Sequence, residues 1–336
     1  MAQRVVLHVG CMKSGTTFIQ QTLISNQDEL ARQGHIFPGG TWRRHVLGIS
    51  DFLGMQRDGD RVRGSEGAWD AMVEEIRSHE GTAIISMEYL AAARPVNIRR
   101  IVEALAPAHV DVVLTVRDLG RNIPAMWQEK MKNGVVWDWE SYLDLVRSGA
   151  EQEGGPGYRF WRQLAAVPIA GKWRRVVGNE NFYLITVPPP GAPPTLLWER
   201  FCSVAGLDPE PFEFGARSNT SLGAASTNVL QLLNEELGED FLLEDYMEVV
   251  KAGLAQDGMA AWRKEEPTLG YTARWIGPRA NQMIEGLRSM DLQVVGDLDE
   301  LKAHPVKGTP PPKVSTDDML KAAVRALAYM VRETKR

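Results

Sequence analysis

Residues 5–24 read VVLHVGCMKSGTTFIQQTLI. The first five are a short, mostly β-branched apolar run ending at a glycine, which is typical of a buried parallel strand. From residue 16 onward, apolar side chains recur at helical spacing. A glycine-containing loop between a strand and a helix presents backbone N–H groups and the positive end of the helix dipole to an anion. The stretch therefore predicts an α/β fold with a phosphate-binding loop.

Side chains in this loop strengthen the prediction. Ser14, Thr16 and Thr17 supply hydroxyl donors, and Lys13 supplies a mobile positive charge. In an ordinary nucleoside triphosphatase loop, GxxxxGK[ST], the lysine follows the second glycine. Here the two glycines keep that spacing, but the lysine lies inside the loop. The loop is therefore predicted to bind phosphate, with its lysine placed differently from the lysine of an ordinary nucleoside triphosphatase loop.

Strand and helix patterns alternate through the first two-thirds of the chain. Further strands are predicted at 35–37, 83–86, 110–116 and 181–187, and helices at 68–78, 98–105, 123–132, 140–148 and 195–205. This alternation is typical of a parallel sheet with right-handed crossovers. We expect a P-loop-type three-layer α/β fold, with a central parallel sheet flanked by helices.

The domain organisation follows from the same patterns. Residues 1–225 are predicted to form the nucleotide-binding core, within which residues 41–66, rich in Gly, Arg and Asp, are a surface or lid segment that shapes the substrate site. Residues 226–336 are predicted to be a mostly helical extension packed on the core. That extension contains one strand, at 292–295, and a last amphipathic helix at 316–332.

Composition excludes several classes of protein. The chain has 336 residues with 44% hydrophobic and 24% charged residues, which is globular composition. A net charge of −5 disfavours a nucleic-acid binder. Two cysteines and six histidines give neither a disulfide framework nor zinc-ligand spacing, which favours a reducing, cytoplasmic setting. Neither a signal peptide nor an apolar run of about 18 residues is found, so no membrane span is expected.

Two motifs carry a resemblance to a known family. The GxxKSGTT pattern of residues 10–17 resembles the 5′-phosphosulfate loop of sulfotransferases that use 3′-phosphoadenosine 5′-phosphosulfate (PAPS). In that family a second strand ends in an arginine that holds the 3′-phosphate, and Arg117 occupies the matching position after residues 111–116. A guanidinium fork suits phosphate oxygens. The family's serine eight residues further on is replaced by Ala125. Residues 180–223 and the C-terminal part resemble, more loosely, a bacterial subgroup of sulfotransferase-like proteins.

The resemblance also implies a catalytic base. Family members place a base just after the third core strand, where this sequence has Glu88, and some branches use a glutamate there. His45, in the basic and aromatic segment 41–45, is the alternative base. His8 lies within the first strand and is predicted to be a core histidine. The resemblance further implies that Lys13 stabilises the leaving 5′-phosphate, so no metal is expected.

A last loop completes the implied cofactor site. In the family a basic loop closes over the 3′-phosphate, and Arg217, Ser218 and Asn219 are the matching candidates. The sequence thus predicts a sulfotransferase that moves a sulfuryl group from PAPS to a hydroxyl or amine of a small-molecule or glycan acceptor. Two alternatives stay open. One is an ATP-dependent phosphotransferase. The other is a catalytically inactive nucleotide-binding scaffold. This alternative stays open because alanine at position 125 replaces the serine of the family.

Overall fold

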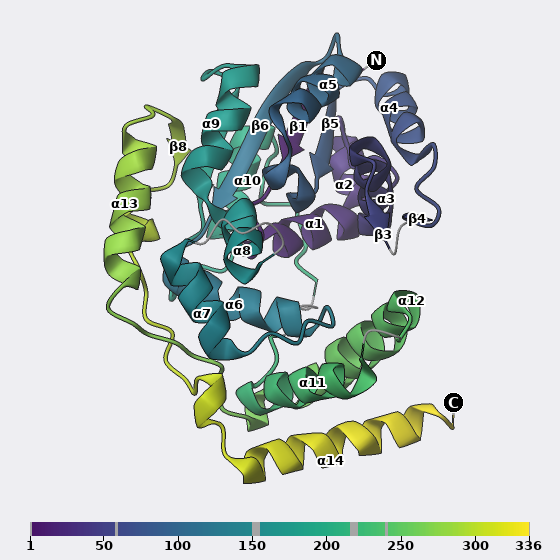
Figure 1. Cartoon of the computed structure of the whole chain (residues 1–336). Helices are drawn as coiled ribbons and strands as arrows, with labels where there is room; N and C mark the ends of the chain where they lie inside the picture. Colours follow the sequence, from purple (N-terminus) through teal and green to yellow (C-terminus); the bar gives the residue numbers. More distant parts are fainter. Residues whose placement is uncertain (1, 58–59, 150–154, 216–220, 239–240, 336) are drawn as a thin grey trace. The chain divides into compact units, whose positions relative to one another are not determined.

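The computed structural model describes residues 2–57, 60–149, 155–215, 221–238 and 241–335 (Figure 1). The chain divides into two compact units. The first comprises Met1–Asp118, Arg162–Ala216 and Arg279–Lys302, and the second comprises Leu119–Trp161, Arg217–Pro278 and Ala303–Arg336. The expected boundary at residue 225 therefore falls inside the second unit, and part of the expected C-terminal extension belongs to the first.

A sheet of six parallel strands forms the centre of the first unit, in the order β2-β5-β1-β6-β7-β8. The strands are β1 (Arg4–His8), β2 (His35–Ile36), β5 (Thr82–Ser86), β6 (His109–Val116), β7 (Phe182–Thr186) and β8 (Gln293–Val295). All six were predicted from the sequence, so the parallel α/β fold is confirmed. A separate antiparallel pair joins β3 (Gln56–Arg57) to β4 (Asp60–Arg61).

β1 is the point at which the strand order reverses. The chain leaves β1 toward β2 and β5 on one side, and later crosses over to β6 and β7 on the other. Right-handed crossovers in opposite directions place their helices on opposite faces of a sheet. The open crevice that results lies at the carboxyl ends of the strands beside the reversal, which is where α/β proteins bind ligands.

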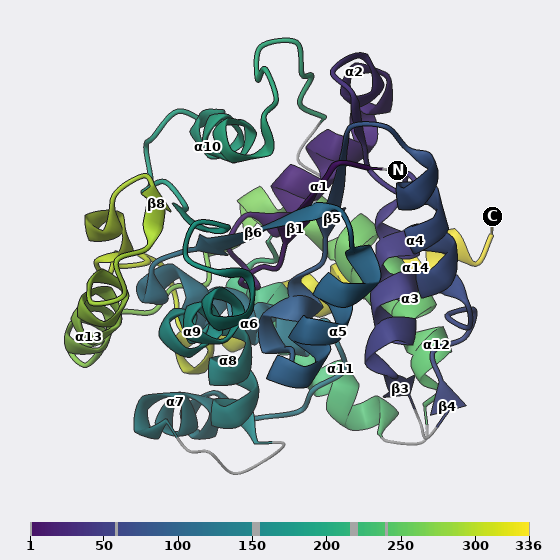
Figure 2. The ribbon, with the colours of Figure 1, turned by 90° about the horizontal axis from the view of Figure 1, so that it is seen from above.

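Helices cover both faces of the sheet. α1 (Thr16–Ser25) and α10 (Leu196–Ala205) lie on one face, and α5 (Pro95–Leu105) and α9 (Ala166–Val177) on the other (Figure 2). On the first face, α1 and α10 bury side chains against the strand residues Val6, Ile84, Val113 and Ile185. On the second face, α9 contacts β6 and β7. The three-layer arrangement of this unit is thereby confirmed.

The first unit contains further helices around the sheet. They are α2 (Gln27–Arg32), α3 (Trp42–Leu53), α4 (Ala68–Ser78), the 3₁₀ turns η1 (Glu88–Ala92) and η4 (Leu298–Leu301), and most of α13 (Ile276–Arg288).

α3 departs from the sequence-based expectation, which gave residues 41–66 as a surface segment. Thr41 caps the helix by accepting a hydrogen bond from the Arg44 N–H at 3.3 Å. Val46, Ile49 and Phe52 line its buried face. Half of this segment is thus a packed amphipathic helix.

The second unit is helical. It contains α6 (Leu119–Met131), α7 (Trp139–Ser148), the start of α8 (Pro156–Leu164), α11 (Ala224–Leu237), α12 (Leu243–Asp245), a π-helical segment η2 (Tyr246–Gly258), the 3₁₀ turns η3 (Met259–Glu265) and η5 (Pro311–Lys313), and α14 (Thr316–Glu333). Buried aromatic rings, Trp127, Trp139 and Tyr142, pack together inside it. Within the described ranges, no helix has the length and apolar character that crossing a membrane requires.

Candidate functional site

The loop between β1 and α1 is anchored to the neighbouring strand β6. The Cys11 N–H donates to the Thr115 carbonyl at 2.6 Å, and the Thr115 N–H donates to the Gly10 carbonyl at 2.5 Å. Cys11 is buried, and burial raises the pKa of its thiol to about 12. The thiol therefore stays protonated and is a packing group. These contacts fix where the loop leaves the sheet.

The loop then turns sharply into α1. Lys13 has a φ of 55° and Gly15 a φ of 81°, so the chain passes twice through the left-handed region. α1 begins directly after Gly15, and no side chain of the described residues caps it. Its first turn carries no acidic residue. The first N–H groups of α1 and the positive end of its dipole thus point into the loop, an arrangement that suits a phosphate.

Gly15 cannot be replaced without moving its surroundings. A Cβ at this position would lie 2.3 Å from Cδ2 of Leu197, which is buried in the core between α1 and α10. We expect Gly15→Ala to lower the free energy of unfolding by about 3 kcal/mol, because a left-handed alanine and an overpacked core each cost about 1–2 kcal/mol.

Gly34→Ala is the matched control for that substitution. Gly34 has a φ of 74° but nothing within 4 Å of an added Cβ, so only the backbone cost of about 1–2 kcal/mol applies. Urea unfolding of both variants measures the difference. Equal losses in the two proteins would contradict the close packing of Leu197 against the loop.

Arg117 follows β6 at the carboxyl edge of the sheet. Its Nη1 donates a hydrogen bond to the Lys13 carbonyl at 3.3 Å. Both side chains are half-buried. The structure therefore brings together the lysine of the loop and the arginine that the second motif singled out, although 104 positions separate them. The Arg117 guanidinium, the backbone of Lys13 and the N-terminus of α1 therefore meet at this edge.

Glu88 stands beside the same loop, at the start of η1 and two positions after β5 ends. A Cβ on Gly10 would lie 3.2 Å from the Glu88 Cβ and 3.3 Å from its Cα, so the absence of a side chain at position 10 lets the two segments touch. The carboxylate is half-buried and accepts a hydrogen bond from Gln20 Nε2 at 3.0 Å. The carboxylate is thus held next to the predicted phosphate-binding loop.

His45, the alternative base, is buried and has both ring nitrogens engaged. Its Nε2–H donates to the Pro38 carbonyl at 2.9 Å, and its Nδ1 accepts from the Ser86 N–H at 3.3 Å. The ring also stacks on Phe37, with centroids 3.8 Å apart. Burial lowers the pKa of His45 to about 4, against the opposing effect of the hydrogen bond to the Pro38 carbonyl. No lone pair is left to take a proton from an acceptor, so the geometry favours Glu88.

His8 is a core histidine, as predicted. Its Nδ1 lies 2.8 Å from Ser86 Oγ and its Nε2 lies 3.1 Å from Thr115 Oγ1. Burial lowers the pKa of His8 to about 3. The ring therefore stays neutral, and both nitrogens tie β1 to its neighbours on either side.

These two neutral histidines make the fold sensitive to acid. In the unfolded chain each would take up a proton near pH 6.5, whereas the folded protein binds none until far lower pH. The unfolded state thus binds more protons below about pH 6.5, and stability falls as the pH drops from there toward 4. We expect urea unfolding to show a loss of about 1 kcal/mol per histidine between pH 7.5 and 5.5.

His45→Gln isolates one histidine, since an amide can also donate to the Pro38 carbonyl and accept from the Ser86 N–H. This variant should lose about half of the histidine-linked pH dependence of stability. A pH dependence equal to that of the wild-type protein would contradict a buried, neutral His45.

The other predicted site residues divide between the loop and positions away from it. Ser14 is buried in the loop, and at the start of α1 Thr16 is buried and Thr17 is half-buried. Arg217, Ser218 and Asn219 lie outside the described residues. Ala125 lies on α6, in the second unit. In the described ranges, no group of three or more His, Cys, Asp or Glu side chains is arranged to hold a metal ion.

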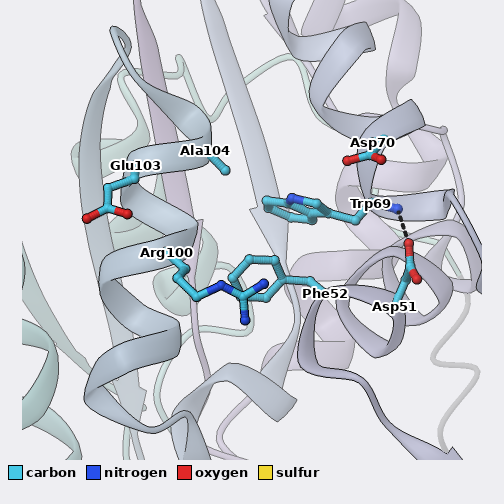
Figure 3. Close-up of a pocket in the computed structure, with 7 residues that line it drawn as sticks. All are labelled: Asp51, Phe52, Trp69, Asp70, Arg100, Glu103 and Ala104. Carbon is cyan, nitrogen blue, oxygen red and sulfur yellow. Dashed lines mark hydrogen bonds between the residues drawn. The ribbon is translucent and has the colours of Figure 1, made fainter.

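A pocket of about 500 Å³ lies between α3, α4 and α5 (Figure 3). Its lining residues are Asp51, Phe52, Trp69, Asp70, Arg100, Glu103 and Ala104. The Arg100 guanidinium lies 5.2 Å from the centre of the Phe52 ring. The backbone N–H of Trp69 donates a hydrogen bond to Asp51 Oδ2 at 3.2 Å. None of these residues belongs to the loop or is one of the predicted catalytic or cofactor-binding residues, although Asp51 and Phe52 lie in the segment 41–66 that was expected to shape the substrate site.

Comparisons with known proteins add little. No family model matches the chain, and no curated protein matches it. Among solved structures it is similar to the crystal structure of a sulfotransferase from Alicyclobacillus acidocaldarius, with 16% sequence identity and a TM-score of 0.42 over 78% of this chain and 100% of that one. A similarity of this size does not establish a family. What the fold and site define is an α/β protein in which a lysine-containing loop leads into the N-terminus of a helix at the carboxyl edge of the sheet.

Proposed function

We propose that this protein is a sulfotransferase that uses PAPS and transfers the sulfuryl group to a hydroxyl or amine of a small-molecule or glycan acceptor. The observation that carries the proposal is the meeting of Lys13, Arg117 and the N-terminus of α1 at one edge of the sheet, with Glu88 against the same loop. The donor carries two separate anionic groups, and the residues present fit both. The loop suits the 5′-phosphosulfate, and Arg117 suits the 3′-phosphate.

Each residue has a defined part in the transfer. When bound, PAPS supplies the sulfuryl group. Glu88 takes the proton from the acceptor as the acceptor oxygen or nitrogen forms its bond to sulfur. The bond between sulfur and the bridging phosphate oxygen breaks, and the Lys13 ammonium stabilises the negative charge that develops on that oxygen. The N–H groups of the loop and of α1 hold the 5′-phosphate throughout.

Arg117 should decide which nucleotide binds. We expect Arg117→Ala to weaken binding of 3′-phosphoadenosine 5′-phosphate (PAP) about 10- to 100-fold, because a hydrogen-bonded charge pair is worth about 1.5–3 kcal/mol. Binding of AMP, which lacks the 3′-phosphate, should change much less. Calorimetric titration of both nucleotides measures the two effects.

Arg99→Ala is the matched control, because Arg99 is exposed on α5 of the same unit. This variant should bind PAP like the wild-type protein. An equal loss of PAP and AMP binding in Arg117→Ala would contradict the assignment of Arg117 to the 3′-phosphate.

A further inference from the structure

Gln20 is a buried polar residue that the sequence analysis did not single out. It lies on α1 with 1% of its surface exposed. Its Nε2 donates to Glu88 Oε2 at 3.0 Å, to Ser86 Oγ at 3.2 Å and to the Ser86 carbonyl at 3.3 Å. The carboxylate and the carbonyl can only accept, so the amide group of Gln20 must face them with its nitrogen. One side chain of α1 thus holds both the end of β5 and the candidate base.

A buried chain of hydrogen bonds fixes the groups around Gln20. The Thr115 hydroxyl donates to the Gly10 carbonyl at 3.1 Å, so Thr115 Oγ1 accepts from His8 Nε2–H. His8 Nδ1 then accepts from the Ser86 hydroxyl, whose oxygen accepts from Gln20. Every donor in this series of hydrogen bonds meets an acceptor. The donors all point the same way along the series, from Gln20 to the Gly10 carbonyl of the phosphate-binding loop. Such a fully satisfied buried network is rigid.

The same helix also carries the anion-binding end of the loop. Gln20 lies four positions after Thr16, which places both on one face of α1, about 6 Å apart along its axis. A single rigid helix therefore sets the separation between a phosphate at its N-terminus and the carboxylate that Gln20 holds. We propose that Gln20 is a positioning residue that aims the Glu88 carboxylate at the acceptor. This inference rests on the proposed function, in which Glu88 is the base.

The test is the rate of sulfuryl transfer in Gln20→Met, which keeps the length of the side chain and removes its donor. We expect PAPS turnover, followed as released PAP with a mixture of phenols, amines and sugars as acceptors, to fall about 10- to 100-fold, since a misplacement of about 1 Å can cost 100-fold. The KM for PAPS and the calorimetric Kd for PAP should stay within about twofold, because the phosphate contacts are unchanged. Gln21→Met is the control, as Gln21 is exposed on the same helix.

A double-mutant cycle separates positioning from a general structural effect. If Gln20 acts through Glu88, then Gln20→Met combined with Glu88→Gln is no slower than Glu88→Gln alone. Losses that multiply in the double variant would overturn the inference. Gln20→Asn serves as a second variant where Gln20→Met does not fold, because it keeps an amide that is too short to reach Glu88, and it should also turn over slowly.

The two levels of the proposal fail in different ways. A wild-type protein that neither binds PAP nor turns over PAPS contradicts the proposed function and this role together. A wild-type enzyme that binds PAP and turns over PAPS, but whose rate is unchanged by Gln20→Met, contradicts the positioning role alone.

Discussion

Lys13→Met should lower PAPS turnover about 100- to 1,000-fold. In the proposed mechanism the Lys13 ammonium stabilises the charge that develops on the leaving phosphate oxygen, and removing one such group costs about 100- to 1,000-fold in rate even where other donors remain. Lys13 sits at a φ of 55°, and methionine bears the same backbone cost there, so the substitution removes the charge without adding strain. Methionine also keeps the apolar stem of the side chain.

Three quantities are measured for the variant: the rate of PAP release, the calorimetric Kd for PAP and the thermal unfolding curve. The product retains both phosphates, so its binding should weaken by about tenfold or less, which is about 1.4 kcal/mol. Lys313→Met, at an exposed lysine of the second unit, should match the wild-type protein in all three. Near-normal turnover in Lys13→Met would rule out the proposed role for the loop lysine.

Glu88→Gln should also have a large effect, a fall of about 100- to 10,000-fold in turnover, which is the usual contribution of a general base. Glutamine has the shape of glutamate, and its side-chain oxygen can still accept the hydrogen bond from Gln20, so the local structure should survive. What is lost is the ability to take a proton. Binding of PAP should therefore change by no more than about twofold.

Glu80→Gln provides the control, since Glu80 is exposed in the same unit. It should turn over PAPS at the wild-type rate. If Glu88→Gln also kept the wild-type rate, Glu88 would not be the base, and the proton would have to leave the acceptor by another route.

The fold was predictable where local pattern and tertiary structure agree. β1, β5 and β6 are buried on both faces, so each appears in the sequence as an apolar run. α3 was missed because two arginines precede its apolar residues Val46, Ile49 and Phe52, and a glycine and an aspartate interrupt them, in a stretch with flanking glycines. In the structure Gly48 lets α4 approach, since a Cβ there would lie 2.8 Å from the Met72 methyl.

The site was predictable only in part. The loop and Arg117 each follow a strand, and the carboxyl ends of parallel strands share one edge of a sheet, so sequence order alone places them together. Gln20 could not be found this way, because its partner Glu88 is 68 positions distant and the contact depends on how α1 packs over β5. The only signal was a glutamine four positions after Thr16 on the same helix face. His45 was wrongly predicted as a candidate base, because its basic and aromatic neighbours indicated an exposed loop, whereas the structure buries the ring.

Calorimetric titration of the wild-type protein with PAP, beside AMP and beside ATP with magnesium, tests the central claim most directly. We expect micromolar binding of PAP and binding of AMP at least about tenfold weaker, a difference of about 1.4 kcal/mol that corresponds to one charge-assisted phosphate contact. Tighter binding of ATP with magnesium than of PAP would contradict the account in favour of a phosphotransferase. Binding of none of the three would contradict it in favour of a scaffold in which the loop holds no nucleotide.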